Sequence, residues 1–379
     1  MPLSDSDNSR DKDQQAMPSS PRVWLLLGHK AGDNAQVLAL AEALGWPCES
    51  KHMVYRRTEL VTNRMLGTSL AGIKKHDSSS LKPPWPDLVI SAGRRNEPVA
   101  RWIKKQASSP VRLVHFGRTW APARCFDLII TTPQYKLPAG TNVLQNNLPL
   151  HHITADKIAA AKADWLPRLE HLPRPYIAVL VGGHSSAHSL TTEKAALLGR
   201  QAMELARKEN GSLLITTSMR TPASVISALQ AVIDMPNYFY HWQVDDSENP
   251  YIAYLALADK FIVTGDSVSM LAEACMTRKP VYIFPGSAST QVTGRSGISS
   301  LLSDIRGVQA RVAISRIANR LAPRRMIRDI GVIHRQLLES GRAAWLGESF
   351  TGAPVIPPQD DLEQATARVR SLFDSANAD

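Results

Sequence analysis

Short apolar runs alternate along the chain with longer segments in which apolar residues recur every three or four positions. The short runs have the composition of buried strands, and the longer segments have the period of helices with one apolar face. Expected strands lie at residues 22–27, 87–91, 111–116, 127–131, 176–181, 213–216, 237–240, 261–263 and 281–284. Expected helices lie between several of them, the longest over residues 191–210. This alternation predicts an α/β protein with two Rossmann-like parallel-sheet domains that face a cleft.

The same pattern suggests where the domains begin and end. Residues 1–21 are polar, mix acids with bases and contain no apolar segment, which predicts a disordered tail rather than a signal peptide. The prolines Pro173 and Pro175 separate two α/β halves, which we place at residues 22–165 and 174–345. The remaining segment, residues 346–379, includes a predicted helix over residues 361–373, which we expect to cross back to the first domain.

Composition narrows the class of protein. Of the 379 residues, 44% are hydrophobic and 21% are charged, as in soluble globular proteins. No apolar run approaches the roughly 20 residues that a membrane-spanning helix needs. The three cysteines, Cys48, Cys125 and Cys275, show no C-x-x-C spacing, which argues against a disulfide framework and a structural zinc site. We therefore expect a cytoplasmic protein.

A net charge of +10 predicts an anionic partner. Residues 94–124 carry eight basic side chains against one acid, Glu97, and would face an anionic membrane surface or a lipid-linked acceptor. This would make the protein peripheral to the inner membrane. Residues 306–335 carry eight arginines with helix-like spacing, which also fits an ordinary solvated face. No nucleic-acid-binding motif accompanies the charge, so nucleic acid is not expected as a partner.

Three loops of the second half follow predicted strands, at residues 182–186, 217–220 and 265–269. Loops at the carboxyl ends of parallel strands share one edge of the sheet, where ligands bind. Together they offer backbone N–H groups, hydroxyls and the cation Arg220, which suits a diphosphate. The alternative is that Gly, Ser and Thr are common in the loops of any α/β domain.

Residues 264–274 read TGDSVSMLAEA and predict a turn from a strand into a helix. Ser267 and Ser269 fall at the helix start, where free N–H groups and the helix dipole favour an anion. Glu273 lies one turn further on, within reach of a sugar hydroxyl beside a bound phosphate. The ordinary alternative is a capped helix. Trp242 would either stack a base or fill the core as an aromatic wedge.

The first loop of the first half, residues 28–34, carries His29 and Asp33. Either side chain could accept the proton of an attacking hydroxyl, and the alternative for Asp33 is a helix cap. The glycine spacing in this loop differs from the G-x-G-x-x-G of a dinucleotide turn. His184 and His188 are four residues apart but have no third partner, so no metal site is expected.

Five ordered motifs resemble a known family: GHKAGDNAQ at residues 28–36, SAGRRNEPVA at 91–100, TTSMRTP at 216–222, ENPY at 248–251 and TGDSVSMLAEA at 264–274. The family is the mitochondrial-fission group named for the elongated mitochondria of plants. Its bacterial members are often labelled nucleoside-diphosphate-sugar epimerases. Met219 and Asn96 depart mildly from its pattern.

The resemblance implies the two-domain GT-B glycosyltransferase fold, which needs no metal. There, a strand–turn–helix of the second domain holds the donor diphosphate and a glutamate bonds the donor ribose. Ser267, Ser269 and Glu273 match these positions. The expected donor site comprises Gly182, Gly183, His184, Ser185, Thr217, Arg220, Trp242, Asn249, Asp266, Ser267, Ser269 and Glu273. The expected acceptor side, in the first domain, comprises Gly32, Asn34, Gln36, Arg94 and Arg95, with Asp33 or His29 as the catalytic base.

The sequence thus predicts a metal-independent glycosyltransferase-like enzyme that uses a nucleotide diphosphate-sugar as substrate and no cofactor. The competing hypotheses are a non-catalytic adaptor of the fission family and a non-oxidative sugar-nucleotide epimerase on the same fold. A short-chain epimerase is excluded, because no tyrosine is followed by a lysine four residues later.

Overall fold

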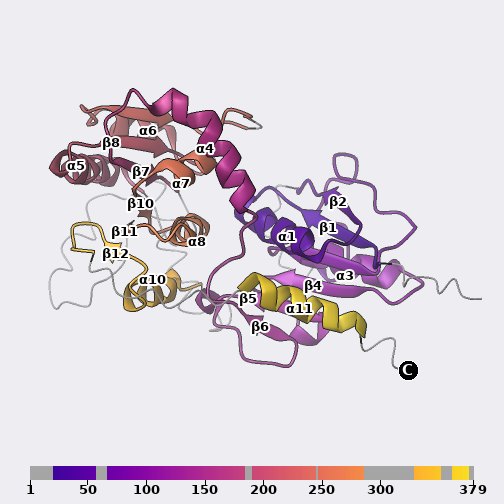
Figure 1. Ribbon diagram of the computed structural model, residues 1–379. Helices are drawn as coiled ribbons and strands as arrows, with labels where there is room; N and C mark the ends of the chain where they lie inside the picture. The colour runs from indigo at the N-terminus through magenta and orange to yellow at the C-terminus, as the bar shows by residue number, and fades with distance from the viewer. Residues whose placement is uncertain are drawn as a thin grey trace, which may run out of the picture.

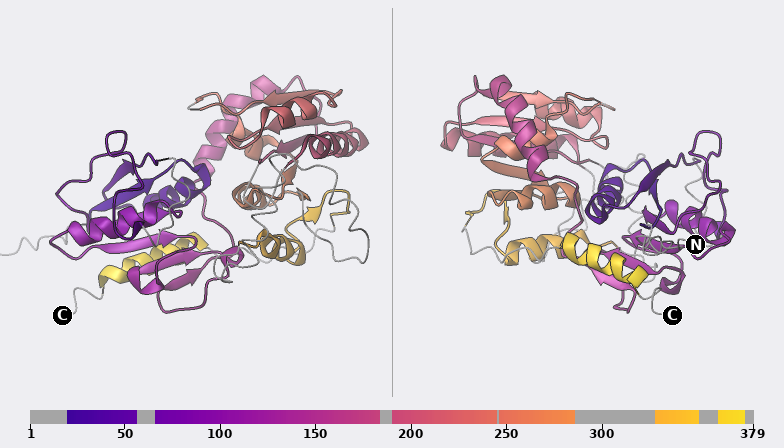
Figure 2. Two further views of the ribbon diagram at one scale, coloured as in Figure 1. Left: turned by 180° about the vertical axis from the view of Figure 1, so that it is seen from behind. Right: turned by 45° about the vertical axis from the view of Figure 1, so that its right-hand side comes forward.

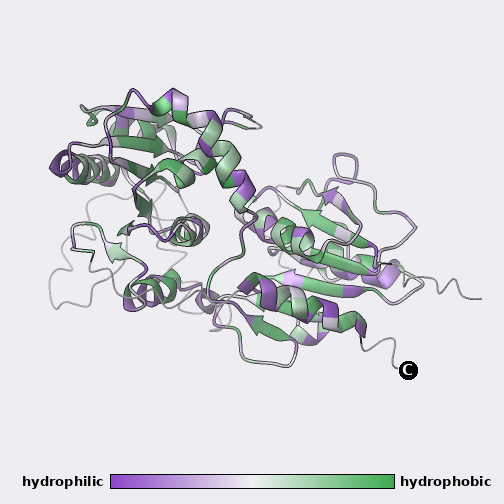
Figure 3. Cartoon of the chain, in the orientation of Figure 1, coloured by the Kyte–Doolittle hydropathy of each residue, from purple (hydrophilic) through white to green (hydrophobic). Residues whose placement is uncertain are grey.

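The computed structural model describes residues 20–56, 66–183, 190–244, 246–285, 328–350 and 361–374. Within these ranges the chain forms two α/β domains, each around a six-stranded parallel sheet (Figure 1). Figure 3 shows that the strands of both sheets are largely hydrophobic. The prediction of two Rossmann-like domains is therefore confirmed. No helix in the described ranges is long and apolar enough to span a bilayer.

The first sheet has the strand order β2-β1-β3-β4-β5-β6. Its strands are β1 (Val23–Leu27), β2 (Cys48–His52), β3 (Leu88–Ala92), β4 (Arg112–Phe116), β5 (Leu128–Thr131) and β6 (Val143–Gln145). The helices are α1 (Ala31–Leu44) and α3 (Asn96–Gln106), with the 3-10 turns η1 (Ala123–Cys125) and η2 (Pro133–Tyr135). β1 and β3 are buried along their whole length because helices cover both faces of the sheet.

The second sheet has the order β12-β11-β10-β7-β8-β9. Its strands are β7 (Tyr176–Leu180), β8 (Ser212–Thr216), β9 (Asn237–Tyr240), β10 (Lys260–Thr264), β11 (Val281–Phe284) and β12 (Ala344–Trp345). Its helices are α4 (Ala155–Leu169), α5 (Thr192–Lys208), α6 (Ala223–Gln230), α7 (Tyr251–Leu257), α8 (Val268–Met276) and α10 (Ile330–Glu339). Residues of α5 and α6 pack on one face of the sheet, and residues of α4, α7, α8 and α10 pack on the other.

Three strands and two helices are absent from the sequence-based prediction: β2, β6, β12, α4 and α10. All three strands lie at sheet edges. In β2, with the sequence CESKH, only Lys51 is buried. An edge strand is covered less completely than a central one, so it does not need the apolar run by which the other strands are recognised.

The last helix, α11 (Asp361–Asp374), lies against α1 of the first domain (Figures 1 and 2). Ala365 and Val369 are fully buried in the same core as Val37 and Leu40 of α1. At the start of α11, the Asp361 carboxylate accepts hydrogen bonds from the backbone N–H groups of residues 147 and 148, at 3.0 and 3.1 Å. The C-terminal helix therefore contributes to the hydrophobic core of the first domain.

Truncation of Val369 to alanine tests this packing. The change removes two buried methyl groups, so we expect Val369→Ala to lower the free energy of unfolding by about 2 kcal/mol. The measurement is urea unfolding followed by circular dichroism. Gln364→Ala, at an exposed position of the same helix, is the control and should have little effect. Equal stability of the two variants would contradict a core role for α11.

Candidate functional site

Each sheet has one point from which successive strands are added in opposite directions, between β1 and β3 in the first and between β7 and β10 in the second. The connections from such a pair of strands turn to opposite faces of the sheet and leave a crevice at its carboxyl edge. In the second domain the crevice lies between residues 181–183 after β7 and residues 265–267 after β10. Both loops were predicted to belong to the donor site.

The Asp266 carboxylate connects the loops of the second domain. It is 5% exposed, accepts a hydrogen bond from the backbone N–H of Gly183 at 3.0 Å, and pairs with the Arg220 guanidinium at 3.2 Å. A Cβ on Gly182 would overlap with this carboxylate, and a Cβ on Gly183 would overlap with the carbonyl of Arg220. Both glycines are therefore required by close approach of neighbouring groups.

The loop after β8 is tied to the same crevice. The hydroxyl of Thr221 donates to the carbonyls of Val181 and Gly182, while the buried Thr217 hydroxyl accepts from the backbone N–H of Trp242 at 2.9 Å. Arg220 is 38% exposed in its side chain, so its guanidinium lies at the rim. Three loops thus form one hydrogen-bonded surface at the carboxyl edge, with a cation beside it.

Helix α8 begins at this surface. Ser267 occupies its N-cap position but makes no capping hydrogen bond through its side chain, so the capped-helix interpretation does not hold for this serine. Ser267 is buried and Ser269 half-buried.

Glu273 is 8% exposed and accepts a hydrogen bond from the Tyr251 hydroxyl. Burial raises the pKa of Glu273 to about 7, although the hydrogen bond from Tyr251 opposes the shift. Burial, and then the charge of Glu273, raise the pKa of Tyr251. Asn249 sits just before α7 and accepts from the backbone N–H of Tyr251 at 3.0 Å, which fixes the position of this tyrosine.

In the first domain the crevice lies at the start of α1. This helix begins at Ala31, so Gly32, Asp33 and Asn34 belong to its first turn and not to the preceding loop. Asn34 fixes the end of β1, since its side-chain amide exchanges hydrogen bonds of 2.9 and 2.8 Å with the backbone of Gly28. Gln36 donates weakly to the carbonyl of Gly32, at 3.4 Å.

Asp33 points across the crevice toward the loop after β3. A Cβ on Gly93 would lie 2.5 Å from Oδ2 of Asp33. The N-cap position of α1 is occupied by Lys30, without a side-chain capping bond, so the interpretation of Asp33 as a cap is wrong. His29 is exposed and its ring packs edge-on against Tyr55, with 5.5 Å between the ring centres.

The first turns of α1 and α8 lie close together although they belong to different domains. A Cβ on Gly32 would lie 2.6 Å from Oγ of Ser269. The expected acceptor side therefore adjoins the expected donor side at this point. A carboxylate from the first domain and a diphosphate-compatible surface from the second flank the same region.

The other predicted site residues have varied surroundings. Trp242 is half-buried, which fits neither a wholly enclosed wedge nor a free platform. Arg95 donates to the carbonyl of Arg56 at 3.4 Å, and the Arg94 guanidinium lies 5.5 Å from the Trp120 ring centre.

His184 and Ser185 lie outside the described residues. Within those residues, no group of three or more His, Cys, Asp or Glu side chains is placed to hold a metal ion.

Sequence reasoning missed Tyr251 and Thr264 as site residues. Tyr251 falls within the ENPY motif, but its contact with Glu273 joins two helices and has no local sequence signal. Thr264 ends β10 and accepts from the backbone N–H of Gly182 at 2.8 Å.

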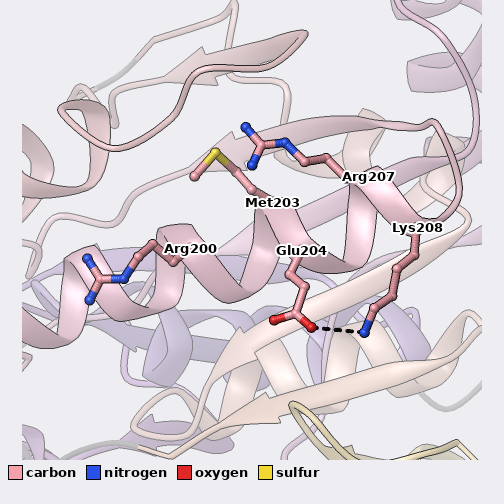
Figure 4. A pocket seen from close by; sticks show the side chains of 5 residues that line it. All are labelled: Arg200, Met203, Glu204, Arg207 and Lys208. Atoms are coloured by element: carbon pink, nitrogen blue, oxygen red, sulfur yellow. Dashed lines mark hydrogen bonds and ion pairs between the residues drawn. The ribbon is translucent and has the colours of Figure 1, made fainter.

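A separate shallow hollow lies along α5, lined by Arg200, Met203, Glu204, Arg207 and Lys208 (Figure 4). These residues come from the C-terminal half of α5. Because α5 runs back from the carboxyl edge of the sheet to its amino edge, the hollow lies away from the three loops. Glu204 and Lys208 pair with each other at 2.9 Å.

Comparison with known proteins identifies the family. Residues 31–300 match the model of the family described as Mitochondrial fission ELM1. The chain belongs to this family. The resemblance drawn from the five sequence motifs is thus confirmed.

Two relatives of this ELM1-family chain are similar at the sequence level. It is 27% identical over 296 residues to an uncharacterised protein of Rickettsia prowazekii, covering 69% of this chain and 82% of that protein. It is also 27% identical over 241 residues to the mitochondrial fission protein ELM1 of Arabidopsis thaliana. That match covers 58% of this chain and 56% of the plant protein.

Among solved structures, the chain is similar to the UDP-GlcNAc 2-epimerase of Neisseria meningitidis bound to UDP-GlcNAc. The TM-score is 0.49 and the sequence identity 13%, over 93% of this chain and 100% of the epimerase.

The raised pKa of Glu273 predicts a pH-dependent stability. Because its pKa of about 7 in the folded state exceeds the ordinary 4.5, protonated Glu273 favours folding. This contribution is complete below pH 4.5 and is lost as the pH rises through 7. From about pH 4 to about pH 8, Glu273→Gln should gain roughly 3 kcal/mol of stability relative to the natural chain, because glutamine does not titrate.

Urea unfolding at several pH values measures this difference. Glu339→Gln, at an exposed position of α10, is the matched control and should follow the natural chain at every pH. Parallel pH profiles for Glu273→Gln and the natural chain would show that folding does not raise the pKa of Glu273.

Proposed function

We propose that the second domain binds a nucleoside diphosphate sugar and that the chain transfers the sugar, without a metal ion, to an acceptor hydroxyl held by the first domain. One observation carries this proposal. Three strand-end loops of the second domain are joined by hydrogen bonds into one surface at the β7/β10 crevice, with Arg220 at its rim. Such a crevice is where ligands bind in open parallel sheets.

The donor diphosphate would lie against the backbone N–H groups at the start of α8 and against Arg220. The ion pair with Asp266 orients the Arg220 guanidinium before a ligand arrives. Pre-oriented donors of this kind stabilise the charge that develops on a departing diphosphate. Trp242 would contact the base, and Glu273 the ribose, since a ribose hydroxyl can donate to its carboxylate.

Asp33 would act as the base on the acceptor side. The acceptor oxygen forms a bond to the sugar carbon, the bond from that carbon to the diphosphate breaks, and the acceptor proton moves to Asp33. The closeness of Gly32 to Ser269 supports this role, because it brings the first turn of α1 beside the expected donor. His29 is the alternative base, from an exposed position beside Tyr55.

The competing functions make different demands on the same residues. A non-catalytic adaptor of the fission family needs no nucleotide at the β7/β10 crevice. A non-oxidative epimerase would need the nucleotide sugar but no acceptor. Binding and transfer must therefore be measured separately.

A thermal-shift screen with UDP-, GDP-, ADP-, dTDP- and CMP-linked sugars tests binding. A ligand at 100 times its dissociation constant should stabilise the fold by about 2.7 kcal/mol. Loss of one charged hydrogen-bond donor costs about 1.5–3 kcal/mol, so Arg220→Gln should weaken binding about tenfold or more. Arg200→Gln on α5 removes the same charge away from the crevice and is the control. If no sugar nucleotide raises the melting temperature, the proposal is contradicted.

A second variant, Asp33→Asn, separates transfer from binding. We expect it to bind the sugar nucleotide as the natural chain does and to lose transfer, because the asparagine amide cannot take the acceptor proton. Sugar release or transfer is followed by chromatography of the nucleotide product. Full transfer by Asp33→Asn would shift the base role to His29, and inversion of the sugar without transfer would favour the epimerase.

A further inference from the structure

Arg118, in the loop after β4, is a partly buried cation without a counter-ion among the described residues. Its Nη1 atom is shielded from solvent and has no hydrogen-bond partner. Among the described residues, no carboxylate is one of the charges that act on its guanidinium. A buried charged donor without a partner is costly, so its retention indicates that another group supplies the missing acceptor.

Two further arginines lie near Arg118. The guanidinium groups of Arg94 and Arg118 are 5.5 and 5.6 Å from the centre of the Trp120 ring. The Arg328 guanidinium, from the segment before α10, is 5.8 Å from the Tyr135 ring centre. Burial lowers the pKa of Arg118, and the positive charges of Arg328 and Arg94 lower it further. Three cations from both domains thus repel one another at this place.

The loop that carries Arg118 is held firmly. The fully buried Glu97 carboxylate accepts hydrogen bonds from the backbone N–H groups of Trp120 and Ala121, at 2.7 and 2.8 Å. Arg328 donates to the side chain of Gln134 at 2.9 Å. A ligand would therefore meet an Arg118 loop and an Arg328 side chain that are already held in place, which lowers the entropy cost of binding.

Two acids near the cluster have other partners. Asp329 pairs with Lys136 at 2.7 Å, and Glu97 is occupied by the loop backbone. The pKa of Tyr135 is raised mainly by burial and is also affected by the charges of Arg328, Asp33 and Arg118. Tyr135 therefore lies within electrostatic range of both the cluster and the expected catalytic base, Asp33.

We propose that Arg94, Arg118 and Arg328 form a second anion site and that it takes a phosphoryl group carried by the acceptor. Guanidinium groups offer paired N–H donors that match phosphate oxygens, and several of them together suit a dianion better than a carboxylate. The assignment of the phosphoryl group to the acceptor rests on the proposed transfer function. The anion site itself does not, because it rests on the buried, unpartnered Nη1 atom of Arg118 and on the two arginines near it.

Isothermal titration with inorganic phosphate tests the site on the full chain. Arg118→Gln should bind phosphate about tenfold more weakly or worse. Arg124→Gln, an exposed arginine of the same domain, should bind like the natural chain. Arg118→Gln should also melt no lower than the natural chain, because the change removes a buried charge that has no partner. Equal phosphate binding by Arg118→Gln and the natural chain overturns the proposal, as does absence of phosphate binding in the natural chain.

Two further experiments distinguish this site from the donor site and identify the source of the phosphoryl group. Arg220→Gln should still bind phosphate at the Arg118 site. If Arg220→Gln loses phosphate binding while Arg118→Gln retains it, the proposal is overturned. Sugar-nucleotide binding by Arg118→Gln should be unchanged, so a failure of the donor proposal remains distinguishable. Sedimentation with phosphatidylcholine vesicles, with and without phosphatidic acid, distinguishes a lipid-borne phosphate from a soluble one. Arg118-dependent retention on the acidic vesicles indicates the lipid-borne form.

Discussion

The buried carboxylate of Asp266 holds the crevice of the second domain together. It joins the loop after β10 to the loop after β7 through Gly183, and to the loop after β8 through Arg220. Removing such a group from water is expensive, and the N–H donor and the guanidinium compensate for it. The fit leaves no room for a side chain at Gly182 or Gly183. The shape of the crevice and the position of the Arg220 guanidinium at its rim thus depend on the same carboxylate.

The central strands and the order of the loops were predictable from sequence because their physical requirements are local. A strand covered on both faces must be apolar throughout, as in β1 and β7, and the loops after such strands must meet at one sheet edge. The edge strand β2 was not predicted, because most of its side chains are exposed and its sequence contains no apolar run. The same reasoning located residues 264–274 at a strand–helix turn.

Side-chain partners were less accessible to sequence reasoning. Asp33 suits a helix cap by composition, yet the backbone starts α1 earlier and directs its carboxylate toward Gly93. The charge count revealed a basic stretch around Arg118, but not that Arg328 from the other domain joins it. Contacts of this kind depend on how the two domains pack, and residue order within either half does not encode them locally.

The packing of α11 on α1 means that the chain passes between the domains twice, once between β6 and β7 and once between β12 and α11. A pair of domains joined by one linker can rotate about many axes. A second connection restricts such rotations. The closeness of Gly32 to Ser269, at the first turns of α1 and α8, therefore depends on residues far apart in the sequence, including the helix at the end of the chain.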